Sequence, residues 1–406
     1  MNTRPTGPTV LISGAGIAGT TLAYWLARRG FRPTIVELAT GLRSSGNPVD
    51  VRGPAVEVAE RMGVLPRLRD AATEVTALSF VNTAGRPVGR INMLALQRAS
   101  RSGEVELTRT DLARILFGAS RDSTEILFGD TATAFHQDAG GVDVTFAHSA
   151  PRRFDLVIGA DGLHSTTRRL VFGPEAGFVR HMGLYVATVP LDGPADSRTD
   201  VVIHNAPGRM AALHPVHGRA VAAFVFRHPG VTDFDPRDTE QHRRVLADSY
   251  AGGGWRVPEL LDHARTAEDL WLDSVSRVRI ASWADGRIAL LGDAASSVSL
   301  FGDGSTLAMA GAHTLAEELA ATPADHRAAF ARYEAKHREL VDPRQNNVTA
   351  AAALMVPATR AGIAARNAAT RLWPAVAVGA RLRNRATSRP AHRAPGPTTP
   401  VDADRA

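Results

Sequence analysis

Three glycines and one acid near the start of the chain have the spacing of a phosphate-binding turn. Gly14, Gly16 and Gly19 form a G-x-G-x-x-G pattern, and Glu37 closes the next apolar run. In such a turn the first glycine allows a tight bend, the second lets the backbone approach a pyrophosphate, and the third lets the helix pack on the strand. The helix amides then face the phosphates, and the acid accepts hydrogen bonds from ribose hydroxyls. We therefore predict a dinucleotide site that also includes the residues between the glycines, Ala15, Ile17 and Ala18.

Two later apolar runs also end in an aspartate. Residues 154–158 lead into Asp161, and residues 287–291 lead into Asp293. Continuous apolar runs are typical of strands that are buried on both faces of a parallel sheet. Because ligands bind at the carboxyl edge of such sheets, we expect both carboxylates near the dinucleotide. A helix that follows Gly304 would point its amino-terminal amides into the same crevice.

The order of the elements predicts an α/β fold with a Rossmann-like nucleotide-binding domain, an inserted, mostly antiparallel β-sheet domain for the substrate, and C-terminal helices. The nucleotide-binding domain is discontinuous, and we assign to it residues 1–75, 101–175 and 276–340. We assign 76–100 and 176–275 to the substrate-binding domain, 341–385 to a helical region and 386–406 to a disordered tail.

The patterns also predict individual elements. Besides the strands named above, we expect a hairpin within 76–94 and another within 124–147, with further strands at 185–189 and 221–226. We expect helices at 20–29, 55–65, 112–120, 238–250, 306–320 and 325–340, and an amphipathic region from Asn346 to about Arg385 with breaks at Pro357 and Pro374.

Composition excludes several classes of protein. The chain of 406 residues has no cysteine, so thiolate catalysis, Fe–S clusters and cysteine zinc sites are excluded and redox chemistry must come from a bound cofactor. We expect no metal site. The net charge of +6 arises in residues 343–401, which hold nine arginines and no acid, so nothing favours a nucleic-acid partner.

The sequence also bears on the cell compartment. No stretch approaches the roughly 18 uninterrupted apolar residues of a membrane span, and the first residues do not resemble a secretory leader. We therefore expect a cytoplasmic protein without stable membrane insertion. The oligomeric state has no signature in the sequence.

Over about residues 9–340, the chain resembles the FAD-dependent aromatic hydroxylase family of flavoprotein monooxygenases, which includes p-hydroxybenzoate hydroxylase and the tetracycline-inactivating enzymes. The resemblance rests on three motifs in a specific order. They are Gly14-x-Gly16-x-x-Gly19 with Glu37, Gly159-Ala160-Asp161-Gly162-x-x-Ser165-x-x-Arg168, and Gly292-Asp293-Ala294-Ala295.

This resemblance implies FAD as the cofactor and gives roles to the matching residues. Glu37 would bind the adenosine ribose, and Arg109 matches an arginine beside the ribityl and pyrophosphate groups. Asp293 matches the acid that reaches the pyrophosphate and the ribityl chain. Asp161 belongs to a motif with contacts to both FAD and NAD(P)H, and Asp50 lies where the family chain passes the isoalloxazine.

The function that the resemblance implies is a single-component monooxygenase. It would use NAD(P)H and O2 to hydroxylate or otherwise oxygenate a small aromatic or polycyclic molecule through a flavin C4a-hydroperoxide. The link 296–301 departs from the family pattern, because it lacks proline and is one residue short. This departure motivates one alternative, a non-catalytic protein that sequesters flavin or ligand. A second alternative is another enzyme on the same fold, a two-component flavin epoxidase fed by a separate reductase.

No single catalytic residue can be assigned. His204, His214 and His217 lie on or beside the inserted sheet, where a base or a hydrogen-bond donor would be useful. The alternative is that they are ordinary hydrogen-bonded histidines. Phe224 and Phe226 could likewise line a pocket or belong to the core.

Overall fold

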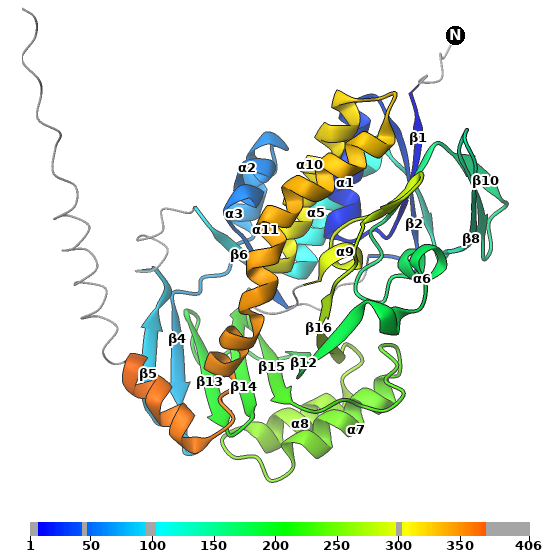
Figure 1. The fold of residues 1–406 in the computed structure, drawn as a ribbon. Helices are drawn as coiled ribbons and strands as arrows, with labels where there is room; N and C mark the ends of the chain where they lie inside the picture. The colour runs from blue at the N-terminus through cyan, green and yellow to red at the C-terminus, as the bar shows by residue number, and fades with distance from the viewer. Residues whose placement is uncertain (1–6, 43–46, 95–102, 298–302, 371–406) are drawn as a thin grey trace, which may run out of the picture.

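The protein contains two large β-sheets with helices packed around them (Figure 1). The computed structural model describes residues 7–42, 47–94, 103–297 and 303–370. In the view of Figure 1 the first sheet and its helices lie in the upper part, and the second sheet lies below them. The predicted α/β architecture with a Rossmann-like unit, a largely antiparallel second sheet and C-terminal helices is confirmed. The predicted domain boundaries stay a prediction.

The first sheet has six strands and is parallel except at one edge. Its strands in spatial order are β17 (Ala284–Asp285), β18 (Ile288–Leu290), β11 (Leu156–Gly159), β1 (Thr9–Ser13), β2 (Arg32–Glu37) and β7 (Glu125–Phe128). The strands that carry the three sequence motifs, β1, β11 and β18, are therefore direct neighbours. Their carboxyl ends meet at one edge of the sheet.

Alternate residues of β1 point to opposite faces of the first sheet, as a strand buried on both sides requires. Val10 and Ile12 belong to the core that this sheet shares with α1 (Ile17–Arg28), α5 (Arg109–Ser120), α10 (Asp303–Ala321) and α11 (His326–Met355). Leu11 belongs to the opposite core, against the small sheet of β8 (Ala132–Gln137), β9 (Val142–Phe146) and β10 (Arg152–Phe154).

The second sheet has seven strands. In spatial order they are β16 (Trp271–Val278), β12 (Val179–Leu191), β15 (Arg219–Arg227), β14 (Arg209–Val216), β13 (Asp200–Ala206), β4 (Ala77–Val81) and β5 (Pro87–Asn92). All neighbours are antiparallel except β13 and β4. One face packs on α7 (Thr239–Tyr250) and α8 (Val257–Thr266), and the other receives the end of α11.

A smaller ribbon and several short helices lie elsewhere in the described residues. β3 (Pro48–Val51) pairs antiparallel with β6 (Val105–Thr108). The short helices are α2 (Pro54–Arg61), α3 (Leu65–Asp70), α6 (Thr166–Phe172), α9 (Asp293–Ser296) and the 3-10 turns at Arg121–Ser123 and Glu175–Gly177.

Several predicted elements have different bounds. The helix predicted at 55–65 is two helices, α2 and α3, because Gly63 adopts a φ of +70° between them. The strand predicted at 154–158 divides at Asp155, whose carboxylate accepts from the Thr9 amide at 2.7 Å. Of the hairpin predicted at 124–147, only β8 and β9 form one, since β7 pairs with β2.

The largest difference is at the C-terminal helices. The helices predicted at 325–340 and from Asn346 are one helix of 30 residues, α11, with Pro343 inside it. Its apolar side chains, among them Phe330 and Val341, lie in the first core, and this packing holds the helix together across the proline. The predicted break at Pro357 is confirmed, because a new helix starts at Arg360. The expected break at Pro374 and the expected disordered tail lie outside the described residues.

Within the described ranges, no single helix is long and apolar enough to cross a membrane. One bent pair of helices, His326–Met355 with Arg360–Thr370, is long and apolar enough when the two are taken together, and this concerns length and composition only.

Candidate functional site

The three strand ends touch one another at the carboxyl edge of the first sheet. A Cβ added at Gly14, whose φ is +106°, would lie 2.6 Å from the Ala160 carbonyl oxygen. A Cβ at Gly292 would lie 3.0 Å from the Cβ of Ala18 in the first turn of α1. Only glycine therefore lets the three motifs approach so closely. The apolar runs that precede the motifs, together with the rule that ligands bind at the carboxyl edge of a parallel sheet, predicted this meeting.

The glycines of the first motif have the roles that the spacing predicts. A Cβ at Gly19 would lie 2.0 Å from the Gly14 carbonyl oxygen, so this glycine allows α1 to pack on the turn. A Cβ at Gly16 would meet nothing within 4 Å, which leaves the backbone open to an approaching pyrophosphate. Ala15, Ile17 and Ala18 are buried between them. The turn therefore fits the FAD that the resemblance implies.

Glu37 is fixed at the end of β2 by two backbone amides. Its carboxylate accepts from the Ala15 amide at 2.8 Å and from the Ala39 amide at 2.9 Å. The two carboxylate oxygens retain lone pairs, so the group is oriented and can still accept from ribose hydroxyls. Binding of the ribose by Glu37 stays a prediction.

Replacing Glu37 by alanine should weaken FAD binding. The substitution removes the ribose acceptor and the anchor of the Ala15 amide, and losing one hydrogen bond to a charged group costs roughly 1.5–3 kcal/mol, or at least about tenfold in the dissociation constant. Titration of the apoprotein with FAD, followed by flavin fluorescence, measures this. Glu37→Gln is the matched control because it keeps the shape and one acceptor. An unchanged affinity for the alanine variant would mean that no ribose is bound here.

Asp161 has a role in its own loop. Its carboxylate accepts from the Thr167 amide at 2.8 Å, from the Thr167 hydroxyl at 2.9 Å and from the Ser165 hydroxyl. These bonds cap the start of α6 and orient the loop that follows β11. The structure therefore gives Asp161 a structural role, and contact with FAD or NAD(P)H stays a prediction.

Asp293, Arg109 and Gly304 come from three elements and lie close together. Asp293 is half-buried, and a Cβ at Gly304 would lie 3.9 Å from its Oδ1. Burial raises the pKa of Asp293, and the positive charge of Arg109 opposes this rise. Arg109 opens α5, where its amide donates to the Asn47 carbonyl at 2.8 Å. A carboxylate and a guanidinium at the edge of β18 and α10 can bind the hydroxyl and phosphate groups of FAD.

Asp50 lies on β3 and connects this ribbon to the start of α10. Its backbone carbonyl accepts from the Ser305 hydroxyl at 2.6 Å and from the Thr306 hydroxyl at 3.2 Å. Burial raises the pKa of the Asp50 carboxyl to about 6, although Arg52 lowers it. Arg52 also binds Asp303, at 2.8 Å, on the first residue of α10. The expected proximity of Asp50 to the isoalloxazine stays a prediction.

The histidines and phenylalanines of the second sheet have structural partners. His214 Nε2 lies 3.3 Å from Glu106 Oε1, and His217 Nε2 lies 3.3 Å from Asp111 Oδ2. His204 contacts the Val81 carbonyl at 3.3 Å. Phe224 and Phe226 are fully buried and belong to the core under α7 and α8.

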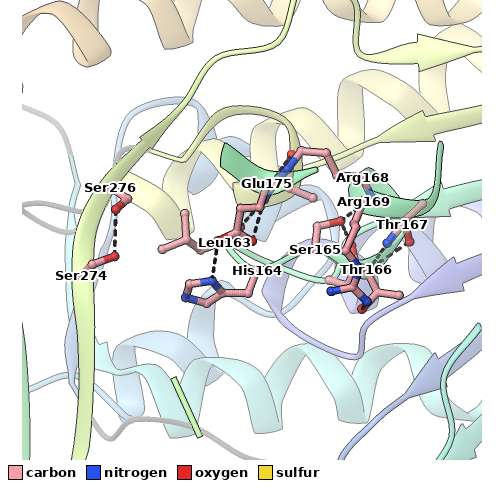
Figure 2. A network of polar contacts seen from close by, with 12 residues as sticks. Leu163, His164, Ser165, Thr166, Thr167, Arg168, Arg169, Glu175, Ser274 and Ser276 are labelled. Carbon is pink, nitrogen blue, oxygen red and sulfur yellow. Dashed lines mark hydrogen bonds and ion pairs between the residues drawn. The ribbon is translucent and has the colours of Figure 1, made fainter. Parts of the chain in front are cut away.

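The structural role of Arg168 was not predicted from the sequence. This arginine was noted only as part of the second motif, yet its side chain is completely buried. Its Nη2 donates to the Leu163 carbonyl at 2.6 Å (Figure 2). Its Nη1 donates to the Ala294 carbonyl at 3.0 Å. Arg168 therefore ties the second motif to the third. No local pattern could have revealed this, because residues 168 and 294 are brought together only by the parallel sheet.

A hollow of about 380 Å3 lies next to α9. It is bounded by Ala295 and Ser296 of α9, by Arg279 after β16 and by Gln345 of α11. Gln345 donates to the Val278 carbonyl at 2.8 Å and to the Ser297 carbonyl at 3.3 Å, and so holds the start of the atypical link. The rest of that link, 298–301, lies outside the described residues. In the described part of the chain no group of histidine and acidic residues could hold a metal ion.

Comparisons with known proteins agree with this geometry. The model of the FAD binding domain family matches residues 8–343. A flavin-dependent monooxygenase of Legionella longbeachae is 31% identical over 344 residues, which covers 83% of this chain and 86% of the relative. An uncharacterised protein of Mycobacterium tuberculosis is 39% identical over 341 residues, covering 83% of this chain and 91% of the relative.

Solved structures show the same fold. The tetracycline destructase Tet(51) superposes with a TM-score of 0.79 at 30% identity and covers 90% of this chain and 95% of its own. HpxO of Klebsiella pneumoniae, solved with FAD and uric acid, has a TM-score of 0.72 at 22% identity and covers 93% of this chain and 96% of its own. The second similarity concerns the fold alone.

Proposed function

Because the chain belongs to the family of FAD-dependent monooxygenases with the FAD binding domain, we propose that it is a single-component enzyme that takes electrons from NADPH or NADH. One atom of O2 would enter a small aromatic or polycyclic molecule. The balanced reaction consumes substrate, O2, NAD(P)H and one proton, and it gives hydroxylated substrate, water and NAD(P)+. The observation that carries the proposal is the meeting of three strand ends around the open turn at Gly16.

FAD, when bound, supplies a two-electron carrier that accepts hydride and activates O2. The residues of this chain bind and orient that group. Gly16 leaves room for its pyrophosphate, Glu37 is oriented to accept from a ribose, and Asp293 with Arg109 provides a carboxylate and a guanidinium beyond β18. The protein also has to exclude water from the reacting edge of the flavin, because water releases peroxide instead of oxygenated product.

Three arginines support a dinucleotide as the reductant. Arg180 on β12 stands directly opposite Arg277 on β16, and Arg279 follows two residues later. Like charges opposite each other repel, so a bound anion would stabilise this cluster. Among the described residues no acid pairs with them, since Arg279 donates only to the amide oxygens of Gln345 and Asn346. Burial and the other two arginines lower the pKa of Arg277. Phosphates of NAD(P)H suit this cluster.

The sequence contains a single G-x-G-x-x-G, which favours a reductant that docks transiently over one held in its own domain. The class of substrate is proposed by analogy. Tet(51) is by its name a tetracycline destructase and shares 30% identity with this chain, which favours a polycyclic molecule with electron-rich rings.

Anaerobic reduction tests the proposal. The purified FAD-loaded protein is mixed without oxygen with NADPH or NADH and with no other protein, and the visible flavin band is followed. We expect the band to bleach and to return when O2 is admitted. A band that bleaches only with a separate reductase would instead support the two-component epoxidase. Bleaching without any ligand-stimulated O2 uptake across a screen of aromatic compounds would support the sequestering protein.

A further inference from the structure

His164 lies between two carboxylates that come from different parts of the molecule. Its Nδ1 is 3.0 Å from Glu175 Oε1, and its Nε2 is 3.2 Å from Asp273 Oδ1. His164 belongs to the loop between β11 and α6, which also carries Asp161, whereas Asp273 belongs to β16 of the second sheet. The imidazole ring therefore joins the loop of the second FAD motif to the second sheet.

Glu175 extends this connection to the third motif. Its Oε1 faces His164, and its Oε2 accepts from Nη2 of Arg168 at 3.3 Å (Figure 2). Arg168 in turn donates to the Ala294 carbonyl at 3.0 Å, one residue after Asp293. A continuous set of polar contacts thus runs from β16 through His164 to α9. Each link is a hydrogen bond or an ion pair between described residues.

The charge of His164 matters for the acids around it. Burial opposes protonation, but the hydrogen bonds and charges of Asp273 and Glu175 prevail and raise the pKa of His164 to about 9. The ring is therefore an imidazolium at neutral pH and donates both N–H groups. Asp273 also raises the pKa of Asp293, so the positive ring partly offsets a negative charge that acts on the candidate cofactor acid.

Other charged and titratable groups face this cluster from the elements packed around it. The positive charges of Arg168 and Arg169 on α6 act to lower the pKa of Glu175. The negative charge of Asp273 acts to raise the pKa of three groups on other elements, which are Tyr185 of β12, His242 of α7 and Asp293 of α9. Of these groups, Tyr185 and His242 have partners of their own in the Val231 amide and the Asp235 carbonyl.

We propose that His164 is a positioning residue of the flavin site, which holds strand β16 of the second sheet against the loop of the second FAD motif. The assignment of the second sheet to the substrate rests on the proposed function, but the contacts do not. If the contact between His164 and Asp273 opens, the loop that carries Asp161 and leads to Arg168 of α6 loses this attachment to β16. The flavin and the substrate surface then lose their fixed relative position.

The first test is the affinity for FAD. In His164→Gln the ring charge is lost while a side chain of similar reach remains, and the dissociation constant for FAD at pH 7 should rise about tenfold, the effect of one charged hydrogen bond. Asp273→Asn removes the charged partner of His164 on β16 and should give a similar change. His148→Gln makes the same replacement at an exposed residue after β9 and should bind FAD like the wild type.

The second test is the pH dependence, which a merely space-filling side chain would not alter. The pKa of His164 is higher in the folded protein than in the unfolded chain. The charged contacts of the ring therefore stabilise the fold fully below a pH of about 6.5, and this stabilisation is lost as the pH rises through about 9. FAD binding by the wild type should therefore weaken between pH 7 and pH 9.5, and His164→Gln should lack this transition. Circular dichroism confirms that each variant is folded.

The proposal is overturned if His164→Gln binds FAD like the wild type and keeps the same pH profile. It is also overturned if Asp273→Asn binds FAD normally while His164→Gln does not, because the contact with β16 would then be unimportant. The wild-type pH titration needs no variant, so an affinity for FAD that stays constant from pH 7 to pH 9.5 overturns the proposal even if a variant fails to fold. FAD binding requires no turnover, so failure of the proposed oxygenase activity is recognised separately.

Discussion

Replacing Asp293 by alanine should give a folded protein that purifies with almost no FAD. The carboxylate follows the end of β18 and lies beside the start of α10, and the positive charge of Arg109 acts on it. Without it, Arg109 loses its opposing charge and the cofactor loses an acceptor. If two charged hydrogen bonds are lost, each of roughly 1.5–3 kcal/mol, the dissociation constant rises at least about a hundredfold. The ratio of flavin to protein after gel filtration and a FAD titration measure the effect.

Two further variants make this test specific. Asp293→Asn keeps the shape and removes the charge, so an intermediate loss would separate the two contributions. Asp285→Ala removes an exposed carboxylate from neighbouring strand β17 and should retain FAD. If Asp293→Ala remains as yellow as the wild type, the third motif does not contact the cofactor.

Substitutions at Gly19 and Gly16 should affect two different properties, the stability of the apoprotein and the affinity for FAD. A Cβ at Gly19 would lie 2.0 Å from a backbone oxygen, so Gly19→Ala must displace α1 from the turn. We expect the apoprotein to lose about 1–3 kcal/mol of stability, as overpacked core sites do. Gly16 has a φ of −74° and open space around it, so Gly16→Val should change the stability of the apoprotein by about 0.5 kcal/mol or less.

The affinity for FAD should respond to the substitution at Gly16, which leaves the stability nearly unchanged. Gly16→Val places a branched side chain where the pyrophosphate approaches the backbone, and FAD binding should fall about a hundredfold or more although the protein is folded. Urea unfolding of the apoproteins and FAD titrations give the two quantities independently. Normal FAD affinity in Gly16→Val would place the pyrophosphate elsewhere, and an unchanged stability of Gly19→Ala would contradict the close packing of α1.

The local part of the site could be predicted because its signals are local. Gly14 needs a positive φ and a close neighbour, Gly16 needs free space, and Glu37 closes a strand, and each requirement selects a residue type within a short segment. The apolar runs before Asp161 and Asp293 likewise identified two buried parallel strands. From these, the rule that ligands bind at the carboxyl edge of the sheet placed three motifs together.

The contacts between distant segments could not be predicted. Arg168 reaches Ala294, and His164 reaches Asp273, across more than a hundred residues of sequence. Which residues meet at such distances depends on sheet register and on the bulge between His181 and Leu184, neither of which has a sequence signature that we could interpret. Pro343 shows the same limit for a helix, because tertiary packing overrides the local rule that proline ends it.

A crystal structure of the protein with FAD would show whether the cofactor lies at the three strand ends. We expect one FAD per chain at the carboxyl edge of β1, β11 and β18, with its pyrophosphate beside Gly16 and the start of α1 and its ribityl chain beside Asp293. A folded protein that takes up no FAD, or a cofactor bound away from these three strand ends, would contradict this expectation.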